Sequence, residues 1–178
     1  GERILPKGVH VIDDPHRKRG HGSKPFDAGG LPNNEIHLVK DGVLENWVLD
    51  LATARKLNLS SNGRASRGIS SPPSPGTTNL YMPASDISPS GLIVDITDGF
   101  YVTELMGFGI NNVTGDYSRG ATGFWIENGT ISYPVSEVTI AGNLKNMFLN
   151  LMQADDLRFK YGTDTPTIRI EGMTVAGN

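Results

Sequence analysis

Apolar and polar residues alternate with a period of two along several short stretches of this chain, which is the pattern of half-buried β-strands. The clearest stretches are 35–40 and 43–47, joined by Asp41-Gly42, because Asp-Gly supplies the positive φ angles of a type I′ hairpin turn. A second hairpin is predicted around the turn Asn128-Gly129. Further strands are expected at residues 9–14, 79–82, 100–105, 108–113, 121–126, 167–170 and 173–175.

Three segments have the pattern of helices instead. Residues 51–57 are rich in Ala, Leu, Arg and Lys. Ser88 is a suitable N-cap with Pro89 in the first turn, so a helix is predicted from there toward Gly99. Asn143 is expected to cap a third helix, in which apolar residues recur with helical spacing at Leu144, Met147, Phe148, Leu151 and Met152.

The fold class follows from the balance of these elements. Strands outnumber helices, and 22 Gly and 11 Pro favour many short elements and turns. The sequence therefore predicts an α+β fold with a mainly antiparallel β-sheet and two or three short helices; a barrel-like closure of the sheet is an alternative. A tight hairpin followed by a helix occurs twice, which suggests an internal duplication. Residues 15–34 and 58–78 are expected to be long loops; the stretch 58–78 is the most flexible-looking of the chain, and a structureless loop of that length is often functional or mobile.

Composition and charge narrow the function classes. Hydrophobic residues make up 37% of the chain, enough for a core. The net charge of −3 lacks the basic excess that duplex DNA binding requires. There is no signal-peptide pattern and no apolar run of the length that spans a bilayer, and there is no Cys. These features favour a cytoplasmic protein. The chain begins Gly1-Glu2-Arg3 without a Met, so residues 1–178 are interpreted as one domain excised from a longer protein.

Candidate metal and catalytic residues are sparse. None of the four His forms a zinc-protease pattern, and only a chance metal site is conceivable at His10, Asp13, Asp14 and His16, with His21 nearby. Ser118 is the best candidate nucleophile because Gly residues flank it in a predicted turn, but no GxSxG pattern surrounds it. No catalytic residue and no metal ligand is therefore assigned.

Two polar segments combine Arg side chains with backbone donors, a combination that suits recognition of peptides or carboxylates. They supply the candidate peptide- or partner-contact residues, with an interdomain salt bridge or loop anchoring as the alternative. These candidates are Asn62, Arg64, Arg67, Asp116, Tyr117, Ser118 and Arg119.

Long motifs resemble the TldD/PmbA family, and specifically its PmbA (TldE) branch. The motifs are FYVTELMGFG at 100–109, NVTGDYSRGA at 112–121, GFWIENG at 123–129, YPVSEVTIAGNL at 133–144 and IEGMTVAG at 170–177. Residues 22–27 and 41–44 fit the same pattern, so the resemblance runs from end to end.

The resemblance implies a function. TldD and TldE subunits pair as a cytoplasmic heterodimeric metalloprotease for peptides or unfolded proteins, and the older family name is modulator of DNA gyrase. Zinc is expected in the TldD subunit, on a helix upstream of this region with a Cys near the carboxy terminus. This chain has no Cys, and the corresponding loop is shortened to about 160–165.

The expected function is thus a non-catalytic domain of the PmbA/TldE subunit, with no cofactor of its own, that shapes peptide binding and subunit assembly beside a TldD-type partner. The alternatives are a domain that is hydrolytic in its own right, through Ser118, and a regulator that contacts gyrase or DNA.

Overall fold

The structure, a computed structural model, describes residues 1–177. The chain divides into two compact units, and each is assembled from segments distant in the sequence. The first unit contains Gly1–Arg3, Lys7–Ala84 and Leu157–Pro166. The second unit contains Ile4–Pro6, Ser85–Asp156 and the segment from Thr167 onward. Within residues 1–177, the region expected to be one domain thus consists of two compact units.

The first unit is built on a five-stranded sheet. Its strand order is β11 (Thr163–Asp164), β6 (Leu80–Tyr81), β1 (Val11–Asp13), β2 (Ile36–Lys40) and β3 (Val43–Leu44). Only β11 and β6 pair in parallel. The predicted β2–β3 hairpin is confirmed, with Asp41 and Gly42 at φ of 48° and 76°.

Helix α1 (Leu51–Lys56) follows this hairpin, as predicted, and begins with a capping box. The Asp50 carboxylate accepts a hydrogen bond from the Thr53 N–H, and the Thr53 hydroxyl accepts one from the Asp50 N–H. The predicted loop at 58–78 contains a two-stranded sheet of β4 (Ala65–Ser66) and β5 (Ser74–Pro75).

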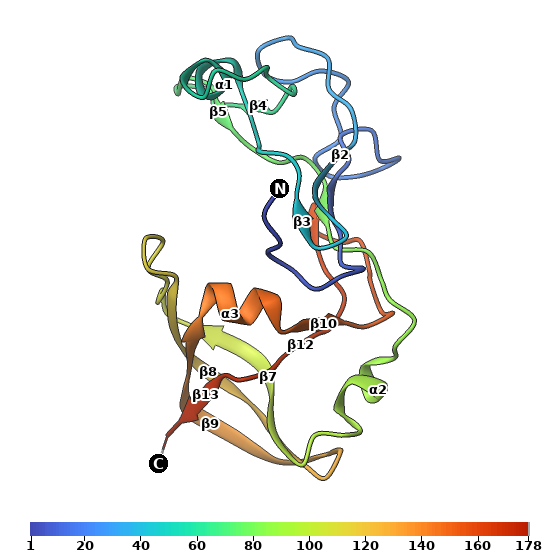
Figure 1. Cartoon of the computed structure of the whole chain (residues 1–178), viewed down its shortest axis with the longest axis vertical. Helices are drawn as coiled ribbons and strands as arrows, with labels where there is room; N and C mark the ends of the chain where they lie inside the picture. The colour runs from blue at the N-terminus through green and yellow to red at the C-terminus, as the bar shows by residue number, and fades with distance from the viewer. Residues whose placement is uncertain (178) are drawn as a thin grey trace. The chain divides into compact units, whose positions relative to one another are not determined.

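The second unit contains a four-stranded antiparallel sheet (Figure 1). Its order is β13 (Thr174–Ala176), β9 (Thr130–Asn143), β8 (Asp116–Glu127) and β7 (Asp98–Met106). The predicted turn at Asn128-Gly129 joins β8 to β9, with φ angles of 48° and 77°. Burial of Ala121, Val138 and Ile140 provides the hydrophobic core of this sheet.

Shorter elements complete the second unit. Helix α2 (Pro89–Ile93) begins at Ser88, whose side chain accepts a hydrogen bond from the Gly91 N–H. Helix α3 (Leu144–Leu149) begins at Asn143. Strand β10 (Leu151–Gln153) then pairs with β12 (Ile168–Ile170).

Two predicted helix ends were wrong. Leu151 and Met152 are not in the third helix, because they pair with Ile170 and Arg169 across the β10–β12 ladder. The second helix stops well before Gly99. The backbone oxygens of Ile96 and Thr97 instead accept hydrogen bonds from the Asn128-Gly129 turn, at 2.8 and 2.9 Å.

The strand predicted at 108–113 was also wrong. Strand β7 ends at Met106, and Gly107 turns the chain with a φ of 77°. Residues 107–115 form a loop with one isolated bridge, between Ile110 and Tyr117. Conversely, Ser118 lies inside β8 and not in a turn.

The α+β class with a mainly antiparallel sheet and three short helices is confirmed. All four sheets within residues 1–177 are open, so the alternative of a closed barrel is not realised there. The hairpin followed by a helix does occur twice, as β2–β3–α1 and β8–β9–α3, and a common origin stays a prediction. No helix in this part of the chain combines the length and the apolarity that a membrane crossing needs.

Candidate functional site

The polar candidates of the first unit lie around strand β4. Asn62 links the ends of a loop: its amide oxygen accepts a hydrogen bond from the Leu49 N–H at 3.0 Å, and its amide nitrogen donates to the Trp47 oxygen at 2.7 Å. Arg67 is exposed. Arg64 is completely buried. These three candidates are close in sequence, but they differ in burial and in hydrogen bonding.

Arg64 is held by an ion pair inside the first unit. Its Nε lies 2.5 Å from Asp13 Oδ2, and both side chains are 0% exposed. Its terminal nitrogens donate to the backbone oxygens of Asp13, Asn34 and Asn62, at 3.2, 2.6 and 3.1 Å. These contacts favour loop anchoring as the role of Arg64, and peptide contact by Asn62 and Arg67 stays a prediction.

The candidates of the second unit lie at the start of β8. Tyr117 packs against the core of the sheet, whereas Ser118 is exposed. The Asp116 carboxylate accepts hydrogen bonds from the Thr114 hydroxyl at 2.7 Å and the Asn143 amide at 3.3 Å. These bonds lower the pKa of Asp116, and the bond from Thr114 has the largest effect. The carboxylate form of Asp116 is therefore favoured.

Arg119 closes one side of a cleft with a volume of about 270 Å³. The other lining residues belong to the loop 107–115: Gly107, Phe108, Gly109, Ile110 and Asn112. Arg119 donates one hydrogen bond to the Leu105 oxygen, at 3.3 Å, while its buried Nε has no partner among the described residues. An unsatisfied buried donor is costly, and the guanidinium, which carries only donors, is suited to donate hydrogen bonds to an acceptor group of a ligand.

The loop 107–115 presents apolar side chains to solvent although its backbone is well fixed. Phe108 and Val113 are 108% and 92% exposed. The Asn111 carboxamide oxygen accepts hydrogen bonds from the N–H groups of Val113 and Thr114, which hold the loop in a turn. A Cβ at Gly109 would collide with the Ser118 oxygen, so only glycine permits this close approach to β8.

Strand β7 beside this loop is an open edge of the sheet. It has nine residues and pairs only with β8 in the described part of the chain. Tyr101, Val102, Leu105 and Met106 along it are all partly exposed. A long edge with apolar side chains is a template for pairing with another extended chain.

The residues considered as a chance metal site are used otherwise. Both oxygens of Asp13 are engaged, Oδ2 by Arg64 and Oδ1 by the N–H and hydroxyl of Thr78. His16 Nε2 lies 2.8 Å from the Asn33 side-chain oxygen. Nowhere in residues 1–177 do three His, Cys, Asp or Glu side chains come close enough to hold a metal ion. The expectation that zinc is held by a TldD-type subunit stays a prediction.

Ser118 has no catalytic setting inside its own unit. All four His belong to the first unit, so the second unit has no imidazole base. The Ser118 N–H donates to the Gly109 oxygen at 2.7 Å, which is part of the loop framework. A hydrolytic role of Ser118 stays a prediction without structural support.

Comparison with known protein families matches residues 1–177 to the PmbA/TldA metallopeptidase C-terminal domain. The chain belongs to this family. The PmbA/TldA domain is also 39% identical over 178 residues to the metalloprotease PmbA of Escherichia coli O157:H7, covering 99% of this chain and 38% of that protein. It is 25% identical over 194 residues to the metalloprotease TldD homolog of Buchnera aphidicola, covering 99% of this chain and 40% of that protein.

Solved structures share the fold of this PmbA/TldA domain. A proposed modulator of a DNA gyrase from Thermotoga maritima superposes with a TM-score of 0.85 at 30% identity, covering 99% of this chain and 41% of that one. TldE from Thermococcus kodakarensis gives 0.87 at 24% identity, over 99% and 41%. The chain thus spans about two fifths of the length of these relatives.

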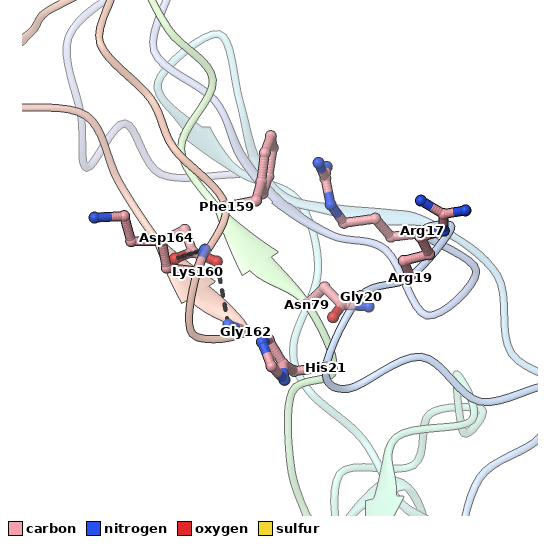
Figure 2. A pocket seen from close by; sticks show the side chains of 9 residues that line it. All are labelled: Arg17, Arg19, Gly20, His21, Asn79, Phe159, Lys160, Gly162 and Asp164. Carbon is pink, nitrogen blue, oxygen red and sulfur yellow. Dashed lines mark hydrogen bonds between the residues drawn. The ribbon is translucent and has the colours of Figure 1, made fainter.

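Sequence reasoning missed two features of the domain. The exposed loop at 107–115 was predicted as a strand, although the glycines at 107, 109 and 115 were a signal for a turn. Arg17 and Arg19 were not among the candidate residues, yet they line a pocket with residues far along the chain (Figure 2). Only the tertiary fold reveals that arrangement.

Proposed function

We propose that this domain is a non-catalytic part of a cytoplasmic metalloprotease of the PmbA/TldD kind. In this proposal it docks onto a TldD-type subunit, which holds the zinc, and supports an extended peptide or unfolded protein substrate. The observation that carries the proposal is the apolar loop 107–115 next to the open edge of β7.

Subunit docking is supported by the two most exposed apolar side chains of the loop. Phe108 and Val113 project from a backbone that hydrogen bonds hold in place, so little conformational entropy is lost on contact. Burial of two such side chains in an interface contributes about 3–6 kcal/mol. Because proteins named TldD and TldE are among the relatives, we take a TldD-type subunit as the partner that contacts this loop.

Peptide support is assigned to β7. An extended peptide that pairs with this edge gains backbone hydrogen bonds independent of its sequence, as substrates that vary in sequence require. The Arg119 guanidinium, whose buried Nε has no partner among the described residues, lies at the end of the same edge. It is suited to a carboxylate or carbonyl oxygen of the bound chain.

The test of the proposal uses the full-length protein and its TldD-type subunit. The double variant Phe108→Ser and Val113→Ser is compared with Ile69→Ser, a control in another loop with 110% exposure. We expect the double variant to weaken association by at least roughly 100-fold, because two apolar contacts are lost. The control should associate normally.

Association is measured by sedimentation, and peptide turnover is followed in parallel. Turnover should fall with association and recover at high subunit concentration, since no catalytic group is removed. Unchanged association of the double variant would refute docking through this loop. Zinc bound stoichiometrically to the full-length protein without its partner would refute the non-catalytic assignment.

A further inference from the structure

Strand β7, the open edge of the second unit's sheet, carries two acidic side chains and no basic one. Its sequence from Asp98 to Met106 contains the carboxylates of Asp98 and Glu104. Both residues are exposed, and neither forms an ion pair in the described part of the chain. The edge proposed to pair with an extended peptide is thus negatively charged.

The remainder of the second unit adds to this negative charge. The unit contains ten Asp or Glu residues but only three Lys or Arg residues, which are Arg119, Lys145 and Arg169. Arg169 is already paired with two of the carboxylates, those of Asp95 and Glu171. The surplus of carboxylates gives the unit a negative potential that attracts cationic segments and repels acidic ones.

The two carboxylates of β7 lie on opposite faces of the sheet. Asp98 is on the core side, because it accepts a hydrogen bond at 2.6 Å from the indole N–H of Trp125, the cross-strand partner of Phe100. Glu104 is on the other side, because its neighbour Leu105 pairs with a buried core residue of β8, and successive side chains of a strand point to opposite faces. A strand that pairs with β7 therefore meets one carboxylate on each face.

The neighbours of these carboxylates complete the chemistry of the edge. Residues directly opposite each other on paired strands have Cβ atoms about 4.5–5.5 Å apart, so opposite charges there attract and like charges repel. The partly exposed side chains between and beyond the carboxylates are apolar or aromatic: Tyr101, Val102, Leu105 and Met106. The charge reverses only at the end of the strand, where Arg119 donates a hydrogen bond to the Leu105 oxygen. The best complement to this edge is a strand that combines apolar residues with Lys or Arg.

We propose that the β7 edge selects extended substrate segments that combine apolar residues with Lys or Arg, and discriminates against acidic segments. This inference rests on the proposed function, because it specifies the substrate class of the same edge. A second copy of this chain is a poor occupant, since pairing of two β7 edges would bring like charges together. Charge complementarity thus favours a basic peptide over self-association.

The test measures binding of three peptides to the full-length protein by fluorescence anisotropy with an uncharged dye. The peptides share one apolar sequence with blocked ends, and carry Lys, Gln or Glu at two positions, one on each face of the extended chain. The variant is Glu104→Gln. Glu137→Gln is the matched control, because Glu137 is an exposed carboxylate of the same unit but lies in β9, between β8 and β13. Thermal unfolding checks that both variants are folded.

We expect the Lys peptide to bind on the order of tenfold more tightly than the Glu peptide, with the Gln peptide between them. This preference should shrink at high salt, because exposed charges are screened. Glu104→Gln should lower the affinity for the Lys peptide by about threefold and leave that for the Gln peptide unchanged, because one cross-strand charge pair is lost. Glu137→Gln should bind all three peptides as the unmodified protein does.

Three results would contradict the charge preference. Equal binding of the three peptides would overturn it and leave peptide pairing with β7 standing, whereas absence of binding by all three would overturn both. An equal loss of Lys-peptide affinity in Glu137→Gln would show that the net charge of the unit and not the edge is recognised. Self-association of Glu104→Gln with unchanged Lys-peptide affinity would show that this carboxylate only keeps copies of the chain apart.

Discussion

Replacement of Arg64 by methionine is expected to destabilise the first unit strongly. The change removes the only ion-pair partner of Asp13 seen in the described chain and leaves that carboxylate at 0% exposure. It also removes the hydrogen bonds that the guanidinium donates to the backbone oxygens of Asp13, Asn34 and Asn62. Methionine fills much of the space, so the loss is mainly electrostatic and not a cavity effect.

The magnitude follows from the burial of both partners. Removing one member of a buried ion pair costs about 3–5 kcal/mol, because the other charge stays buried without compensation. This is a large fraction of the roughly 5–15 kcal/mol that stabilises a typical domain. With a urea dependence of about 2 kcal/mol per molar, the unfolding midpoint should fall by about 2 M.

The assay is urea unfolding of the full-length protein, followed by circular dichroism and tryptophan fluorescence. Arg67→Met is the matched control, because Arg67 is exposed and should change the free energy of unfolding by less than about 0.5 kcal/mol. Adding Asp13→Asn to Arg64→Met should restore part of the stability, since no charge is then buried and Thr78 keeps its acceptor.

The reasoning would be refuted if Arg64→Met were as stable as Arg67→Met. A stable Arg64→Met protein that bound peptide or partner less tightly would instead support the interpretation of Arg64 as a contact residue.

Three further predictions concern single positions. Gly129→Ala should lower the free energy of unfolding by roughly 1–3 kcal/mol, because its φ is 77° and a Cβ would collide with the Val94 oxygen, whereas Asn128→Gly should be nearly neutral; thermal unfolding compares the two. Burial raises the pKa of Asp27, but hydrogen bonds from the N–H groups of Ala65, Leu31 and Gly29 outweigh it and hold the pKa below its usual 3.8. The folded pKa is thus below the unfolded one, so this stabilisation is complete above the unfolded value and is lost as the pH falls through the folded value; Asp27→Asn should show a smaller loss of stability in acid titrations, and an unchanged slope would contradict this. Ser118→Ala should leave peptide turnover by the assembled protease unchanged, and a loss of turnover without loss of association would revive the hydrolytic alternative.

The sequence by itself determined the local elements whose signals are short in range. Asp41-Gly42 and Asn128-Gly129 specified two hairpins, because few other residue pairs adopt two consecutive positive φ angles. Ser88 and Asn143 began helices, because their side chains satisfy backbone N–H groups that the helix leaves free. Family membership was also evident, since the motifs extend along the chain.

Only the tertiary structure decided where those elements stop and what their polar residues do. Leu151 and Met152 have helical spacing, but hydrogen bonds to a strand about twenty residues away prevail over that local preference. Arg64 and Arg67 look alike in sequence, yet one is buried against Asp13 and the other is exposed. The pocket of Arg17 and Lys160 joins residues from opposite ends of the chain, and no local pattern records such a meeting. The physical reason is the same in each case: burial and long-range pairing depend on which segments fold together, and this information is not contained in any single segment.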